Sequence, residues 1–435
     1  MYGIITSLLL IVFIALIAWG KIERQWISIA IMFILILSGA VSIDEIFVYV
    51  DWDVLGLILC VSILTVYLEI SGFTKLTAKY IVKASKGSAY LLIFSISLMA
   101  GLISIFMENV SVVILLFPIV YTVCRSLGID PVIPTIMLTL SANIAGSATM
   151  IGDPPAILTA GAFKLTFTDF IVYRGKPSMF FFTLVSMLSA ITITSTIGSS
   201  KLNTQRNTTY RFRYVEDGLP SSMDRLFLIE ALVFLTIKIV LLSLRHSLHI
   251  PLSLAGVIAI GGISIARIIH KDINSVTYAF KNGFEWKLLL FLIGVFTLSG
   301  AFEKHGIAYM LAEKLVEIFK DNVIALTSSL LYLMVILSSV LDNVPLTMTM
   351  IPVVKRISEL LSVDPVTIMW SVLIGITLGG NLTYMGASAN VTAIRLLEKN
   401  GYNVSFTDFI KLSVVYNTVS IVSAWILYIV LYVMM

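Results

Sequence analysis

The chain has 435 residues, of which 58% are hydrophobic and only 12% are charged, whereas soluble domains carry roughly 25% charged residues. This composition excludes a soluble globular protein and indicates a polytopic membrane protein whose surroundings are the lipid bilayer. The net charge of +4 comes from basic residues scattered between apolar segments, which argues against nucleic acid as a partner.

The two cysteines, Cys60 and Cys124, lie in separate apolar segments without a second thiol or histidine at ligand spacing. We therefore expect free buried thiols, with no structural metal site and no disulfide framework. The first apolar run, 4–19, has no basic segment before it. It is expected to be a retained span and not a cleaved signal.

Apolar runs of a length suited to membrane helices recur along the whole chain. They lie near residues 4–19, 26–42, 54–70, 88–107, 110–127, 132–162, 178–198, 225–243, 250–268, 286–302, 323–341, 343–361, 365–394 and 412–434. We expect helices, because lipid offers no partner for unpaired backbone groups. Two segments that mix lysines with apolar residues, 72–86 and 304–320, are expected to lie along the membrane surface.

The distribution of positive charge predicts an orientation. If 88–127 and 323–361 are helical pairs that enter and leave on one side, most lysines and arginines fall in loops on a single face. Such loops are typically cytoplasmic, so both termini are expected on the extracytoplasmic side of the cell membrane. The polar segment 199–224 divides the chain nearly in half and is predicted to be a cytoplasmic linker.

An internal repeat relates the two halves, because residues 52–152 align without a gap to residues 286–386. Matched identities include Trp52 with Trp286, Glu69 with Glu303, Asn109 with Asn343, Pro118 with Pro352, Gly146 with Gly380, Thr149 with Thr383 and Gly152 with Gly386. Each half contains an odd number of single crossings. A helical pair adds an even number, whether its arms cross the membrane or only dip into it, and so leaves the total odd. The second copy is therefore inverted, an architecture found in transporters.

We accordingly predict an all-α polytopic membrane protein with an inverted-topology repeat, two hairpins and two discontinuous helices. The first repeat is assigned to 1–198, with its hairpin at 88–127 and its broken helix at 132–162. The second is assigned to 225–435, with its hairpin at 323–361 and its broken helix at 365–394.

The first candidate site residues lie where "FMENVSV" (106–112) and its copy "VLDNVPL" (340–346) separate two apolar arms. Each copy places a carboxylate before an amide, Glu108-Asn109 and Asp342-Asn343. Amide and carbonyl oxygens at a hairpin tip can hold a cation, and free N–H groups at the next helix start can hold an anion. The alternative is that each asparagine merely caps the second arm.

The other candidates lie in "NIAGSATMIGDPPAIL" (143–158) and its copy "TLGGNLTYMGASANVT" (377–392). Glycines there permit non-helical backbone, while Asp153 is placed to cap a new half-helix that begins with proline. A broken span is tolerable at membrane depth when it lines a polar cavity. The candidates from both stretches are Asn143, Gly146, Thr149, Asp153, Gly380, Asn381, Thr383 and Asn390.

The chain resembles the ion transporter superfamily, and within it the branch of arsenite permeases and P-type permeases related to the pink-eyed dilution protein. The resemblance rests on "ENVSVVILLFPIV", "NIAGSATMIGDPP", "LDNVPLTMTMIPVVK" and "GGNLTYMGASANV" followed by "GYNVSFTDFIK". It implies re-entrant hairpins tipped at Asn109 and Asn343, helices broken near 146–152 and 380–386, a homodimer, and an elevator-like movement of a transport domain.

The leading functional hypothesis is an ion-coupled secondary transporter, not an enzyme, that exports a small inorganic solute such as arsenite or antimonite. H⁺ or Na⁺ is the expected coupling ion, with Na⁺ expected near Asn109 and Asn343, and no other cofactor is expected. The chain contains no Walker motif for ATP, and an accompanying ATPase subunit is left open. The alternatives are a sodium/proton antiporter and, in another class, an ion channel.

Overall fold

The computed structural model describes residues 2–73, 76–77, 80–81, 84, 88–201, 224–320 and 322–434. Most of the predicted linker 199–224 and part of the predicted surface segment 72–86 lie outside these residues. The other predicted surface segment, 304–320, contains helix α17 (Ile307–Phe319), which follows a left-handed turn at Gly306.

The first half of the chain consists of helices with one short β-ribbon. Its elements are α1 (Tyr2–Trp19), α2 (Arg24–Leu37), α3 (Ile43–Tyr49), α4 (Trp52–Leu68), η1 (Glu69–Phe73), α6 (Ala89–Ser104), α7 (Asn109–Leu127), α8 (Val132–Gly146), α9 (Pro154–Ala162), η2 (Thr168–Phe170), β1 (Val172–Tyr173), β2 (Lys176–Pro177) and α10 (Met179–Lys201).

The second half repeats this helix order. Its elements are α12 (Arg225–Ser243), α13 (Arg245–Leu248), α14 (Leu252–Ile269), α15 (Ile273–Gly283), α16 (Trp286–Lys304), α17, α18 (Val323–Ser338), α19 (Asn343–Leu361), α20 (Pro365–Gly379), α21 (Ser388–Lys399), α22 (Phe406–Tyr428) and η3 (Ile429–Val433). The predicted fold class, an all-α membrane protein with hairpins and discontinuous helices, is confirmed.

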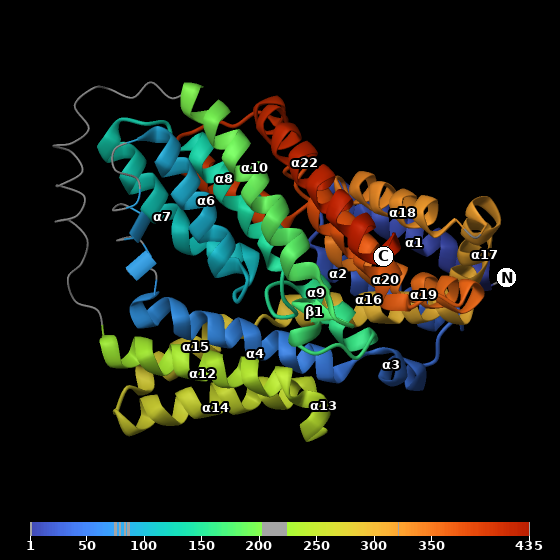
Figure 1. The fold of residues 1–435 in the computed structure, drawn as a ribbon. Coiled ribbons are helices and arrows are strands. Elements are labelled where there is room, and N and C mark those ends of the chain that lie inside the picture. Colours follow the sequence, from blue (N-terminus) through green and yellow to red (C-terminus); the bar gives the residue numbers. More distant parts are fainter. Residues whose placement is uncertain are drawn as a thin grey trace.

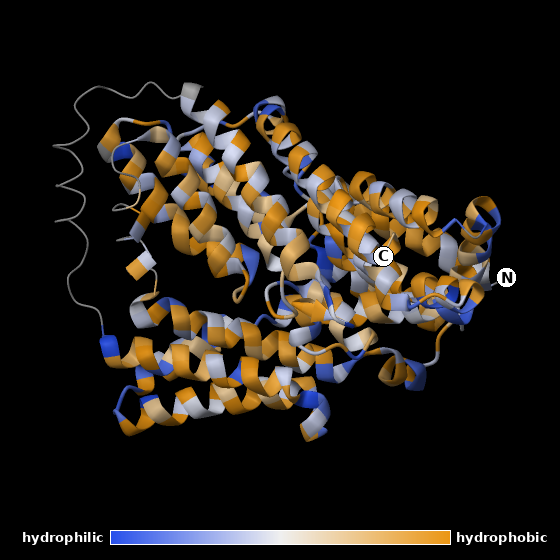
Figure 2. Ribbon diagram, viewed as in Figure 1, coloured by the Kyte–Doolittle hydropathy of each residue, from blue (hydrophilic) through white to orange (hydrophobic). Residues whose placement is uncertain are grey.

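Length and composition suit several of these helices to a membrane. Among the described residues, six helical segments are long and apolar enough to cross: Trp52–Phe73, Met179–Ser199, Arg225–Ser243, Leu252–Ile269, Ile273–Lys304 and Phe406–Val433. Three of the four hairpin arms (α6, α7 and α18) and the first parts of the broken helices are apolar but shorter. Figure 2 shows apolar residues along most of the helices, with the most hydrophilic residues mainly at helix ends and connections.

Local sequence explains two differences from the predicted runs. The predicted run 26–42 ends as a helix at Leu37, and α3 begins separately because Ser42 and Glu45 form a capping box. The ribbon β1–β2, which the sequence did not reveal, turns through Arg174 and Gly175, both with positive φ. Its Tyr173 hydroxyl donates to Asp364 at the start of α20.

Equivalent helices of the two repeats make equivalent contacts. Helix α4 packs against α14, as α16 packs against α2, and each hairpin packs on its own broken helix through α6–α8 and α18–α20. The repeats also interlock, because α9 packs against α19 and α21 packs against α7. Figure 1 shows the hairpin α6–α7 and the hairpin α18–α19 approaching the middle of the molecule from opposite ends.

A glycine permits the close approach of α2 and α16. A Cβ atom added at Gly294 would lie 2.6 Å from the Cβ of Ser28 and 2.7 Å from its backbone. Among the residues that the structure describes, nothing lies within 4 Å of a Cβ added at Gly261 in α14, which makes that glycine a matched control.

We expect Gly294→Ala to lower the melting temperature of the purified protein, because overpacking costs about 1–3 kcal/mol. Gly261→Ala should leave it unchanged or raise it, since alanine favours a helix over glycine by roughly 1 kcal/mol. Thermal unfolding in one detergent compares the two variants. Equal melting temperatures would contradict the α2–α16 contact.

Candidate functional site

The two hairpin tips have the same construction. Glu108 caps α7 and accepts a hydrogen bond from the backbone N–H of Ser111 at 2.9 Å. Asp342 caps α19 and accepts one from the backbone N–H of Val344 at 3.0 Å. The acids therefore perform the capping role, while the asparagine that follows each acid opens the second arm.

Each tip asparagine is bound by a serine that ends the first arm of the same hairpin. Ser104 donates to the Oδ1 atom of Asn109 at 2.6 Å, and Ser338 donates to the Oδ1 atom of Asn343 at 2.6 Å. Because these serines occupy matched positions of the repeat, the sequence alignment could have revealed them. They fix the orientation of the tip amides.

The broken helices pass directly behind these tips. Helix α8 ends at Gly146 and α20 ends at Gly379, next to Gly380. A Cβ at Gly146 would lie 2.2 Å from the Oδ1 atom of Asn109, and a Cβ at Gly380 would lie 2.9 Å from that of Asn343. Only a residue without a side chain leaves room for the tip amides at these breaks.

Threonines join each break to the hairpin beside it. Thr149 donates its hydroxyl proton to the carbonyl of Ile105 at 2.5 Å, and Thr383 donates to the carbonyl of Ser339. The acceptor carbonyls belong to the tips, where the backbone leaves its helix. The threonines thus pair with carbonyl groups at the points where the backbone leaves its helix, as non-helical backbone at membrane depth requires.

The second half-helices begin differently in the two repeats. In the first, Asp153 caps α9 by accepting from the N–H of Ala156 at 3.0 Å, and Pro154 and Pro155 form its first turn. The prolines therefore start a helix, as predicted. In the second, Ala387 occupies the position equivalent to Asp153, and α21 has no side-chain cap.

Three buried asparagines connect the repeats at the centre. The amide nitrogen of Asn143 donates to the Oδ1 atoms of Asn381 at 2.8 Å and of Asn390 at 2.9 Å. Asn381 in turn donates to the carbonyl of Leu140. This network ties α8 to α21 and to the break after α20.

A second polar chain crosses between the repeats near Asp153. Ser147 donates to the Oδ2 atom of Asp153 at 2.5 Å and accepts from the hydroxyl of Thr377 at 2.8 Å. The carboxylate of Asp153 is thereby oriented by residues from both halves.

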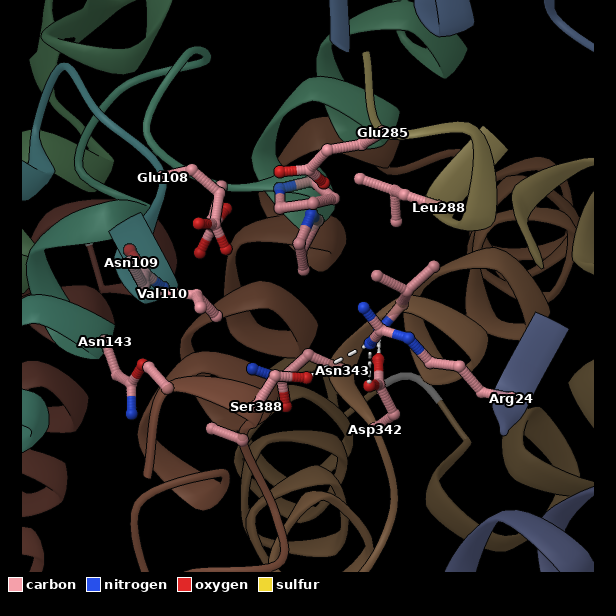
Figure 3. Close-up of a pocket in the computed structure, with 16 residues that line it drawn as sticks. Arg24, Glu108, Asn109, Val110, Asn143, Glu285, Leu288, Asp342, Asn343 and Ser388 are labelled. Carbon is pink, nitrogen blue, oxygen red and sulfur yellow. Dashed lines mark hydrogen bonds and ion pairs between the residues drawn. The ribbon is translucent and has the colours of Figure 1, made fainter. Parts of the chain in front are cut away.

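A cavity of about 150 Å³ lies where these elements meet. Predicted site residues that line it are Glu108, Asn109, Asn143, Asp153, Asp342 and Asn343. The remaining predicted residues, Gly146, Thr149, Gly380, Asn381, Thr383 and Asn390, lie behind the cavity lining, where they pack against or hydrogen-bond the tips and breaks. Figure 3 shows both tip carboxylates and both tip amides around this space.

Two charged residues of the cavity lining, Arg24 and Glu285, were not foreseen. Arg24, which the sequence placed in a loop, forms an ion pair with Asp342 at 2.9 Å and donates to the hydroxyl of Ser388 at 3.1 Å. Glu285 lies immediately before α16 and also lines the cavity. No local pattern marks Arg24 or Glu285, because each comes from a helix end outside the hairpins and the broken helices.

Helical hairpins and broken helices around a central polar cavity define a membrane transporter. The chain matches the CitMHS family, described as a citrate transporter, over residues 14–375. The chain therefore belongs to the CitMHS family, and the resemblance to the ion transporter superfamily is confirmed.

Individual relatives agree with this assignment. An uncharacterized transporter of Mycobacterium tuberculosis is 28% identical over 416 residues, which cover 94% of each chain. The P protein of Mus musculus is 25% identical over 443 residues, covering 85% of this chain and 53% of its own. The YdaH transporter of Alcanivorax borkumensis shares the fold, with a TM-score of 0.57 and 15% identity over 86% of this chain and 84% of that one.

We expect Ser104→Ala and Ser338→Ala each to weaken binding of the transported ligand by roughly fivefold to tenfold, because each removes a hydrogen bond worth about 1 kcal/mol that orients a tip amide. Ser95→Ala is the matched control, since Ser95 is also buried in α6 but donates to the carbonyl of Leu92 in its own helix. Ligand-dependent thermal shifts measure all three. Equal losses in all three variants would contradict the role of the tip serines.

Proposed function

We propose that the protein is an ion-coupled secondary transporter that exports a small inorganic solute, with arsenite or antimonite as the leading candidates. The observation that carries the proposal is the cavity at the junction of both hairpin tips and both breaks. It gathers carboxylates and amides from the two repeats in one place. Rocking or sliding of one set of elements against the other would then expose a single site to either side.

The size of the cavity supports a small solute. Its volume of about 150 Å³ is below the roughly 300–1,000 Å³ of pockets for drug-sized ligands. Neutral arsenous acid presents hydroxyl groups that can donate to amide and carboxylate oxygens and accept from amide nitrogens. The amides of Asn109, Asn143 and Asn343 supply both kinds of partner.

The charge of the cavity opposes an anionic substrate such as citrate, although the family description names it. Four carboxylates line the space, those of Glu108, Asp153, Glu285 and Asp342, against the single guanidinium of Arg24. A tricarboxylate would meet repulsion from these acids in a setting of low dielectric. Buried acids of this kind favour protons or cations, which is the basis for proposing ion coupling.

The same excess of acids favours a second candidate, a sodium/proton antiporter. In that case Na⁺ would bind carboxylate and amide oxygens near Asn109 and exchange with protons on the same carboxylates. The two candidates differ in whether a neutral solute moves at all.

The location and assembly also belong to the proposal. A cell-membrane position with both termini outside is supported by the bias of lysines and arginines toward one set of loops. A homodimer is supported by the resemblance to relatives that pair in this way.

Flux into proteoliposomes distinguishes the candidates. Arsenite movement driven by a pH or Na⁺ gradient, at a rate well above that of empty liposomes, is the expected result. Na⁺-driven proton movement without arsenite flux would favour the antiporter. Arsenite flux indifferent to every ion gradient would contradict ion coupling.

We expect Glu108→Gln to reduce ion-driven flux by about tenfold or more and to remove its dependence on the driving gradient, because glutamine cannot exchange a proton or neutralise a cation. Glu398→Gln is the control, since Glu398 is exposed on α21. Initial rates in proteoliposomes at two driving gradients provide the measurement. Gradient dependence retained in Glu108→Gln would exclude this carboxylate as the coupling group.

A further inference from the structure

The two hairpin tips share an acid cap and a serine-to-asparagine hydrogen bond but differ in charge. At the second tip, Asp342 pairs with Arg24 at 2.9 Å, and Arg24 also donates to Ser388 at 3.1 Å. The guanidinium lies 5.0 Å from the ring centroid of Phe291 in α16, a cation–π arrangement that helps to hold it in place. Arg24 therefore supplies a fixed positive charge where this tip faces the cavity.

The first tip has no such charge. Glu108, Asp153 and Glu285 all line the cavity, and Glu108 interacts electrostatically with both of the other acids. In the described parts of the chain, none of the three acids forms an ion pair with a lysine, arginine or histidine. Arg24 attracts Glu108 and Glu285 electrostatically from a distance, without forming an ion pair with either.

The difference in charge between the two repeats extends from the hairpin tips to the starts of the second half-helices. The two residues that begin the second half-helix are Asp153-Pro154 in the first repeat and Ala387-Ser388 in the second. The second repeat therefore lacks the acid of the first and has a hydroxyl that accepts from Arg24. One side of the cavity has an excess of acids, and the other is neutralised within the protein.

A buried side-chain amide beside this space leaves one oxygen unpaired. Asn143 is 3% exposed and lines the cavity. Its nitrogen makes two hydrogen bonds, yet its buried Oδ1 atom has no partner within the described residues. An unsatisfied buried oxygen costs free energy, which a bound cation or a hydroxyl donor would recover.

We propose that Arg24 takes the place of an exchangeable cation at the second hairpin tip, so that cations or protons exchange only at the first tip, among Glu108, Asp153 and Glu285. The proposal rests on the proposed ion-coupled transport and adds a stoichiometry to it. Arginine stays protonated under all physiological conditions and cannot leave the chain. Two geometrically equivalent tips thus provide one exchangeable site in this conformation.

The test uses the purified full-length protein and measures its melting temperature as Na⁺ is varied at constant pH, and as pH is varied at constant Na⁺. Stabilisation by a ligand grows with the logarithm of its concentration in proportion to the number of sites. The wild type should show the slope of one site. Arg24→Gln, which frees Asp342, should increase that slope about twofold.

Two further variants separate charge from shape. Arg24→Lys keeps the positive charge and should retain the wild-type slope, and Arg24→Gln/Asp342→Asn should restore it by removing the freed carboxylate. Lys287→Gln is the control, since Lys287 is an exposed lysine that pairs with Glu23. An unchanged slope in Arg24→Gln would overturn the inference while leaving ion coupling intact.

A direct count of the ions bound by the wild type needs no variant, so it does not depend on whether a variant folds. Equilibrium dialysis of the wild type with radioactive Na⁺ should give about one bound ion per chain at saturation, or one displaced proton per chain if protons occupy the site. Two bound Na⁺ ions per chain would overturn the inference alone. No response of the wild type to Na⁺ or pH in any assay would overturn the proposed ion coupling, and this inference with it.

Discussion

The structure depends on the contact between a tip asparagine and a glycine at a helix break. Asn109 lies against Gly146, and Asn343 lies against Gly380, so closely that any Cβ would overlap the amide. The contact brings the end of one hairpin to the interrupted backbone of one long segment in each repeat. Serine and threonine hydroxyls then satisfy the exposed groups, which permits non-helical backbone far from water.

Interlocking of the repeats turns these two local arrangements into one site. Because α9 packs on α19 and α21 packs on α7, each second half-helix belongs to the surroundings of the opposite hairpin. The amide of Asn143 and the hydroxyl of Thr377 carry hydrogen bonds across the same boundary. A polar cavity shared by both repeats is the result, and it is what an alternating-access transporter requires.

Local sequence predicted the fold and six of the residues that line the cavity, because glycines, prolines, acids and amides within apolar runs are strong signals. Asn109, Asn343 and Asp153 could all be found in this way, and the repeat could also have revealed the serines behind the tips. Arg24 and Asp342 are separated by 318 positions in the sequence. Periodic patterns indicate local structure and do not predict a contact between residues so far apart. The charge asymmetry therefore emerged only from the contact between Arg24 at the start of α2 and the tip before α19.

The central claim, that oppositely oriented tips meet at one cavity, can be tested through Val110 and Val344, which both line it. Cysteines placed at these positions, in a chain whose Cys60 and Cys124 are replaced by alanine, should be joined within one chain by a short bifunctional thiol reagent. Peptide mass spectrometry would identify the link, and the transported solute should slow its formation. Efficient labelling of each cysteine alone, with no link between them, would contradict the account.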